Sequence, residues 1–179
     1  MRRLSIRGEV FEISEHHYLG LIYNLAKGYF LLAEAYYNYC ESGFADWKGA
    51  LQIPEVGQTE FNEVVEEQID DDELFKAFTY LKDQLQEIKK VNENTITWLA
   101  EFVGIPSVQN KKDKANLERR LKNIIVGGPE GHPQGPIWVL DPEYQALVER
   151  AKSILAGMRT ALHHVDQRIQ QLDAHTPRS

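Results

Sequence analysis

Three segments of about thirty residues each place apolar side chains at alternating steps of three and four, and this spacing is what most constrains the fold. The segments span residues 14–42, 70–104 and 141–172. Steps of three and four keep the apolar side chains on one stripe of a helix, as in bundles and coiled coils. Helices of this length extend about 45 Å, so the three can lie side by side. The sequence therefore predicts an all-α fold, an antiparallel bundle of three long helices.

Residues that typically start and stop helices flank these segments. Ser14 is placed to cap the first helix, and Gly43 can adopt the left-handed conformation that ends it. The acidic run at 70–72 suits the positive end of the second helix. Asp141 followed by Pro142 is the strongest start signal, because proline is favoured at the first helical position. We therefore expect the helix boundaries near these residues.

Shorter elements are expected between the long helices. Apolar spacing predicts two shorter helices, over residues 59–69 and 112–126. The apolar runs at 4–11 and 137–140 could pair as a small ribbon. Strand structure is therefore limited to at most a minor β-ribbon.

The length of the chain bounds its domain organisation. With 179 residues it fits a single domain, because chains this short seldom split into separate cores. We predict one helical-bundle domain over residues 1–179. Within it we expect an N-terminal arm over 1–12, a Gly/Pro-rich loop over 127–140 and a frayed tail over 173–179.

Charge and cysteine content limit the classes of function. The formal net charge of −7 argues against a protein that coats nucleic acid or an anionic membrane. The single cysteine, Cys40, excludes an internal disulfide and favours a reducing compartment. The longest uncharged stretch near the start, residues 16–26, is too short to cross a bilayer. We expect a cytoplasmic protein that does not enter a membrane.

A second apolar stripe follows the first long helix, about 100° around it from the first stripe. Its members are Leu19, Tyr23, Ala26, Phe30, Ala33 and Tyr37. The helix is either a central one that contacts two neighbours within the chain, or an interface, for which tyrosine is well suited. Because the combined face is about twice as wide as a bundle helix needs, we predict self-association as a homodimer or the binding of another helical protein.

An acidic segment precedes the second long helix. Residues 55–73 hold nine acidic side chains and neither lysine nor arginine. The spacing of Glu63 with Glu66, and of Glu67 with Asp70, resembles that of the helical nucleotide pyrophosphohydrolases. The resemblance implies a magnesium site, which needs a second acidic pair on a neighbouring helix, and the sequence offers no such pair. The histidines also lack the spacing of a metal site, so we expect no metal and no cofactor. We expect the acidic segment to form a solvated face.

A basic segment overlaps the second of the shorter helices. Its cationic side chains are Lys111, Lys112, Lys114, Arg119, Arg120 and Lys122. One interpretation is an anion or RNA contact. Another is a solvated amphipathic helix whose Leu117 and Leu121 pack inward. A third joins this segment to the acidic one, because opposite charges on one chain favour self-association or a charged partner.

One short motif suggests catalysis. Arg159 and His164, followed by Val165 and Asp166, form an Arg-x-x-x-x-His pattern that is similar to the motif of the HEPN family. The resemblance implies a helical-bundle protein, often dimeric, that acts as a metal-independent ribonuclease of the toxin or antiviral type. It also implies that Arg159 stabilises phosphate charge and that His164 serves in acid–base cleavage of RNA. Five positions turn a helix by about 140°, so the two side chains diverge unless the site forms between protomers.

Two functions follow from these patterns. The first is a helical-bundle interaction, assembly or regulatory protein, favoured by the wide apolar face and by the lack of a complete catalytic set. The alternative is the HEPN-like ribonuclease, for which RNA would be the substrate. The sequence identifies neither a partner nor a pathway.

Overall fold

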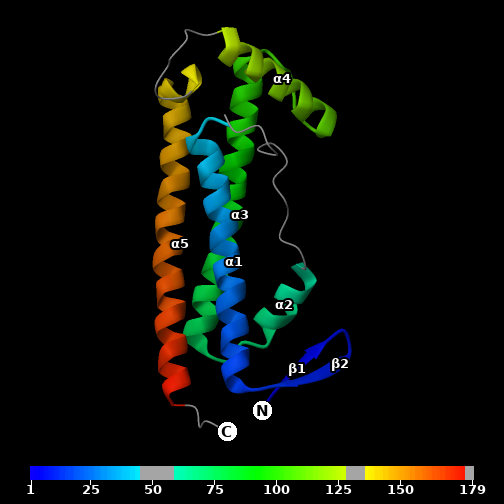
Figure 1. The fold of residues 1–179 in the computed structure, drawn as a ribbon, viewed down its shortest axis with the longest axis vertical. Coiled ribbons are helices and arrows are strands. Elements are labelled where there is room, and N and C mark those ends of the chain that lie inside the picture. The colour runs from blue at the N-terminus through cyan, green and yellow to red at the C-terminus, as the bar shows by residue number, and fades with distance from the viewer. Residues whose placement is uncertain (45–58, 128–135, 176–179) are drawn as a thin grey trace. The chain divides into compact units, whose positions relative to one another are not determined.

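A computed structural model describes residues 1–44, 59–127 and 136–175. These residues form an all-α fold with one small antiparallel sheet, which confirms the predicted fold class (Figure 1). The elements in chain order are β1 (Arg2–Ile6), β2 (Glu9–Ile13), α1 (Glu15–Glu41), α2 (Thr59–Glu67), α3 (Asp72–Phe102), α4 (Lys111–Gly127), the 3₁₀ helix η1 (Ile137–Leu140) and α5 (Pro142–Ala174).

The long helices begin and end where the sequence indicates. The N–H of His17 donates to Ser14 Oγ (3.1 Å) at the start of α1. The N–H of Glu143 donates to Asp141 Oδ1 (2.9 Å) at the start of α5. Gly43 follows the end of α1 with a φ of +66°, in the left-handed region. The predicted caps and the predicted glycine stop are therefore confirmed.

The described residues group into two compact units. Unit 1 comprises residues 1–32, 59–86 and 156–175, and unit 2 comprises residues 33–44, 87–127 and 136–155. Each of the helices α1, α3 and α5 contributes one stretch to each unit. The single domain over residues 1–179 stays a prediction.

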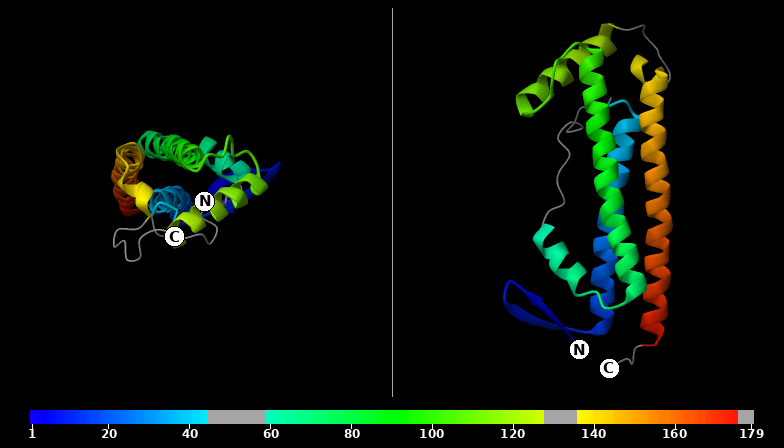
Figure 2. Two further views of the ribbon diagram at one scale, coloured as in Figure 1. Left: turned by 90° about the horizontal axis from the view of Figure 1, so that it is seen from above. Right: turned by 180° about the vertical axis from the view of Figure 1, so that it is seen from behind.

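The helix directions differ in one respect from the predicted antiparallel bundle. Within each unit α5 runs opposite to α1 and α3, but α1 and α3 run in the same direction (Figures 1 and 2). In unit 1 the rings of Tyr29 on α1 and Phe78 on α3 meet edge to face at 5.3 Å. His16 at the start of α1 contacts Asp173 at the end of α5 (3.0 Å). A parallel pair is possible because the long connection over residues 42–71 permits a crossover.

An apolar core and a bridging carboxylate hold unit 1 together. Its fully buried side chains include Tyr18, Ile22, Leu74, Phe78, Leu81, Met158 and Val165. Arg168 of α5 donates to both oxygens of Asp71 (3.2 and 2.7 Å). Asp71 Oδ1 also accepts the N–H of Leu74 (3.0 Å), which caps α3. One carboxylate therefore caps α3 and joins it to α5.

Asp71→Asn is expected to remove this ion pair while keeping the cap, because asparagine caps helices as well as aspartate does. The Arg168 guanidinium that donates to Asp71 holds the pKa of this carboxyl below its ordinary value. The pair therefore stabilises the fold above about pH 4, and this contribution is lost as the pH falls through the lowered pKa. In urea unfolding we expect the variant to be less stable than wild type at pH 7, with the difference closing in acid. Asp72→Asn, at an exposed position, is the control, and a deficit of Asp71→Asn that did not depend on pH would argue against the ion pair.

Unit 2 is built around aromatic side chains. Its core contains Phe44, Ile96, Leu99, Ala100, Ile105, Leu117, Leu121, Trp138 and Tyr144. The indole N–H of Trp138 donates to Gly43 O (3.0 Å), and Tyr144 OH donates to Cys40 O (2.7 Å). Burial raises the pKa of the Cys40 thiol to about 11. Cys40 is therefore a core residue with little thiolate character.

The expected partner of the first strand needs correction. The run at 137–140 is not a strand but forms η1, which belongs to unit 2, and β1 pairs with β2 instead. The reason is local, because Arg7 and Gly8 both have positive φ and turn the chain straight back on itself. The arm expected over residues 1–12 is this hairpin.

Two further predicted segments lie partly outside the described residues. Of the Gly/Pro-rich loop expected over 127–140, residues 128–135 lie outside them. Of the tail expected over 173–179, residues 176–179 lie outside them, and Asp173 and Ala174 belong to α5.

Candidate interaction surface

The N-terminal ribbon, defined here as residues 1–13, is a regular hairpin. Its register places Ile6 opposite Glu9 beside the two-residue turn, and Ser5 opposite Val10 one position further on. In such a hairpin the pair beside the turn exchanges both hydrogen bonds, and bonded pairs alternate with non-bonded pairs from there. The N–H and C=O groups of Ser5 and Val10 therefore point outward, to opposite edges of the ribbon.

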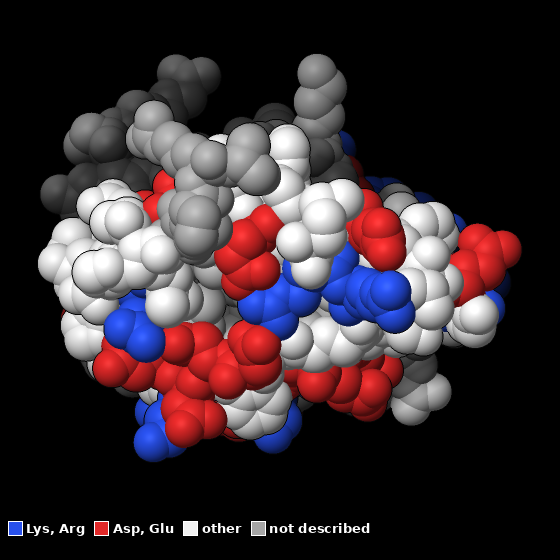
Figure 3. Space-filling model, turned by 90° about the horizontal axis from the view of Figure 1, so that it is seen from below, with Lys and Arg blue, Asp and Glu red and all other residues white. Residues whose placement is uncertain are grey.

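Leu4 and Arg2 of β1 attach the ribbon to the rest of unit 1. Leu4 is buried, at 3% exposure. Arg2 pairs with Glu15 and with Asp70 (2.6 Å), and its guanidinium lies 4.0 Å from the centre of the Tyr18 ring. The hydrogen bond to Glu15 raises the pKa of Arg2 still further, so this group is charged at any working pH. On the face that Figure 3 shows, groups of acidic side chains surround a central basic cluster.

One side chain covers the outer edge of β1 at Ser5. The N–H of Ser5 donates to Gln68 Oε1 (2.8 Å), and Gln68 Nε2 donates to Ser5 O (3.1 Å). Gln68 Nε2 also donates to Val64 O (2.9 Å), which fixes the amide in place. An amide that accepts and donates in this way replaces a neighbouring strand at Ser5.

Among the described residues, nothing covers the outer edge of β2. The N–H and C=O groups of Val10 and Glu12 point away from β1, and no hydrogen bond from the described part of the chain reaches them. The side chains of Val10 and Phe11 are 63% and 45% exposed. An unpaired edge beside apolar side chains is a template for the addition of another strand. We therefore take this edge as the candidate functional surface.

The second stripe of α1, predicted as an interface, lies largely inside the chain. Leu19, Ala26, Phe30 and Ala33 are at most 8% exposed, and Tyr23 and Tyr37 are half-buried. This burial favours the alternative in which α1 contacts neighbours on both stripes. Self-association stays a prediction, but these residues do not supply the exposed apolar face that it would need.

Arg159 and His164 lie on different sides of α5. The Arg159 guanidinium stands over the ring of Phe30 on α1, 5.6 Å from its centre. His164 lines an open groove of about 530 Å³, together with Lys76 and Tyr80 of α3. The side chains diverge, as their spacing predicts, and a single chain does not bring them together. The ribonuclease stays a prediction that requires a site between protomers.

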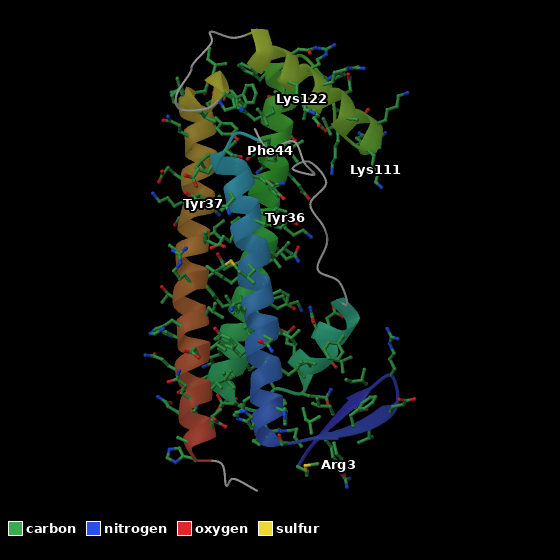
Figure 4. The ribbon with its side chains drawn as sticks, in the orientation of Figure 1. Arg3, Tyr36, Tyr37, Phe44, Lys111 and Lys122 are labelled. Atoms are coloured by element: carbon green, nitrogen blue, oxygen red, sulfur yellow. The ribbon has the colours of Figure 1, made fainter. Side chains whose placement is uncertain are left out.

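The basic segment forms the outer face of α4. Lys111, Lys112, Arg119, Arg120 and Lys122 are exposed and Lys114 is half-buried. Figure 4 labels Lys111 and Lys122 along this helix. Leu117 and Leu121 are buried, as in an amphipathic helix, and Arg120 donates to Val103 O (2.8 Å). An anion or RNA contact at these residues stays a prediction.

Among the described acidic side chains of the acidic segment, Glu66 departs furthest from the predicted solvated face. Glu66 is 9% exposed and accepts hydrogen bonds from Thr79 (3.2 Å) and Lys82 (3.0 Å). It therefore joins α2 to α3. In the part of the chain that the structure describes, no group of three or more His, Cys, Asp or Glu side chains is placed to hold a metal ion.

The sequence indicates the hairpin, but it does not indicate which edge of the hairpin is open. Arg7 and Gly8 form a turn pair between two short runs with apolar residues, which is a hairpin pattern. The cover on β1 has no local signal, because Gln68 is 63 residues from Ser5 in the chain. Without that contact the two edges of the hairpin cannot be distinguished.

None of the described helices carries an apolar stretch long enough to cross a bilayer. Comparison with protein-family models, with curated proteins and with solved structures gives no match. The geometry of the chain itself is therefore the basis for a functional proposal.

Proposed function

We propose that this chain is an interaction and assembly protein that associates with itself. The observation that carries the proposal is the open outer edge of β2, beside the exposed side chains of Val10 and Phe11. Strand addition to such an edge is a recurring mode of protein recognition, in which main-chain hydrogen bonds supply affinity and the flanking side chains supply specificity.

The contrast between the two edges of the ribbon supports the proposal. Proteins protect strand edges with charges, prolines, bulges or covering groups, because open edges promote aggregation. Gln68 covers β1 at Ser5. On β2 the carboxylate of Glu12 is paired with Arg3 (3.5 Å). The edge of β2 carries the charges of Glu9 and Glu12, but no proline lies in β2 and no covering group from the described residues protects this edge.

A cytoplasmic location is part of the proposal. The single cysteine, Cys40, is buried in unit 2, and its raised pKa makes it a poor partner for disulfide exchange. A chain that is stable without a disulfide suits a reducing compartment.

Size-exclusion chromatography with light scattering tests self-association of the full chain. We expect a mass that rises above 20.6 kDa, toward twice this value, as the protein concentration increases through the micromolar range. The change should be reversible on dilution, because small interfaces form transient complexes. A mass of 20.6 kDa at every concentration would contradict the proposal.

The HEPN-like ribonuclease is the competing function. It would combine Arg159 of one copy with His164 of another, since one chain holds them apart. An RNA cleavage assay in EDTA separates the two functions, with wild type compared with His164→Ala. We expect no cleavage by either protein, and cleavage that only the variant loses would favour the ribonuclease.

A further inference from the structure

We propose that two copies of the chain pair through their β2 strands, antiparallel about a two-fold axis at Phe11, so that the two ribbons form one continuous sheet. This inference rests on the proposed self-association and adds the surface and the register. It starts from the main-chain groups of Val10 and Glu12, which point outward and have no partner among the described residues.

The outward groups determine which residues can face each other. In an antiparallel pair, residues whose main-chain groups point toward the partner form the hydrogen-bonded pairs. On β2 these residues are Val10 and Glu12. A two-fold axis therefore permits Val10 opposite the partner's Val10, Val10 opposite the partner's Glu12, or Glu12 opposite the partner's Glu12.

Charge and strand length select the second of these registers. Glu12 opposite the partner's Glu12 would place like charges directly across the sheet, which is destabilising. Val10 opposite the partner's Val10 would leave Glu12 and Ile13 opposite the partner's turn and not opposite its strand. Val10 opposite the partner's Glu12 pairs the whole of β2 and places Glu9 opposite the partner's Ile13. No like charges then lie opposite each other, and both bonds of each Val10–Glu12 pair can form.

Phe11 lies opposite the partner's Phe11 in this register. The pair is non-hydrogen-bonded, the kind in which the Cα atoms approach to about 4.5 Å and the side chains are closest. Phe11 is also opposite Leu4 within the ribbon, so it shares a face with a buried residue. Pairing would therefore extend this apolar face and cover the exposed part of Phe11, and aromatic cross-strand pairs stabilise sheets.

The ribbon does not share the acidic excess of the rest of the chain. The whole chain carries a net charge of −7, so two copies repel each other at most surfaces. Residues 1–13 contain three arginines and two glutamates, a net of one positive charge. Two ribbons therefore repel each other less than two acidic surfaces of the chains would.

Val10→Pro tests the pairing, with Val10→Thr as its matched control. The N–H of Val10 points away from β1, so proline is tolerated at this edge position of a single chain. Proline removes the donor to the partner's Glu12 and places its ring against the incoming strand. We expect light scattering to show a dimer dissociation constant raised at least about tenfold by Val10→Pro and changed less than about threefold by Val10→Thr. Circular dichroism should show the same helix content in both variants.

Phe11→Cys supplies a second measurement that does not depend on how the chain tolerates proline. The native cysteine, Cys40, is buried, so the introduced thiol is the accessible one. The proposed register brings the two introduced cysteines within disulfide range across the two-fold axis. We expect mild oxidation to give a disulfide-linked dimer with Phe11→Cys, and none with Ser5→Cys on the covered edge of β1.

The outcomes separate this inference from the proposed function. A dimer that withstands Val10→Pro and is not cross-linked through Phe11→Cys would overturn the β2 pairing and leave self-association in place. A wild-type chain that is monomeric at every concentration would overturn both, and the edge of β2 would then be open to a strand of another protein.

Discussion

Phe78→Ala is expected to destabilise the protein by about 3–5 kcal/mol, the largest effect among the substitutions that we propose. Phe78 is fully buried in unit 1, and its ring meets that of Tyr29 edge to face at 5.3 Å. Alanine would leave a cavity and remove the aromatic contact as well as the buried area. Urea unfolding followed by circular dichroism measures the effect as a lower midpoint with an unchanged m-value.

Phe75→Ala is the matched control for this substitution. Phe75 is one turn earlier on the same helix, and its side chain is 42% exposed. Its loss should cost less than about 1 kcal/mol, because surface substitutions have small effects. Equal losses at the two positions would contradict the assignment of the unit 1 core.

Gly43→Ala is expected to destabilise unit 2 by about 2–4 kcal/mol, because it combines backbone strain with overpacking. Gly43 ends α1 in a Schellman motif, in which the N–H of Phe44 donates to Tyr39 O (3.0 Å). Its φ of +66° disfavours any residue with a Cβ. An added Cβ would also lie 2.6 Å from Val139 Cγ1 and 2.9 Å from Trp138 Nε1. Thermal unfolding should show the loss directly.

Gly104→Ala separates the two causes. Gly104 ends α3 in the same motif with a φ of +78°, but an added Cβ would meet nothing within 4 Å. Only the backbone strain applies, so the expected loss is about 1–2 kcal/mol. If Gly43→Ala cost no more than Gly104→Ala, the close packing of η1 against the end of α1 would be wrong.

The helices could be predicted because their signals are local. The apolar spacing, the capping oxygens of Ser14 and Asp141 and the glycine after α1 all act within a few residues. The parallel direction of α1 and α3 could not be predicted, because apolar spacing is the same for either direction. The 3₁₀ conformation of residues 137–140 could not be predicted either, because a short apolar run fits a strand and a core-facing turn of helix equally well.

The candidate surface could not be predicted from the sequence, for a different reason. The pattern of α1 shows that its apolar face is wide, but not that Leu19, Ala26 and Phe30 would be covered within the chain. The difference between the edges of β1 and β2 depends on a contact between Gln68 and Ser5, which no local pattern predicts. Surfaces that depend on which long-range contacts form are not readable from spacing alone.

Amide hydrogen exchange of the ribbon, measured by NMR at low and at high protein concentration, tests the β2 pairing most directly. The N–H groups of Val10 and Glu12 point away from β1 in a single chain and would be hydrogen-bonded in the proposed pair. We predict that exchange of these two amides slows as the concentration rises. Exchange at Phe11, which is bonded to β1, and at Ser5, which is bonded to Gln68, should stay unchanged. Equal exchange rates at Val10 and Glu12 at both concentrations would contradict the pairing.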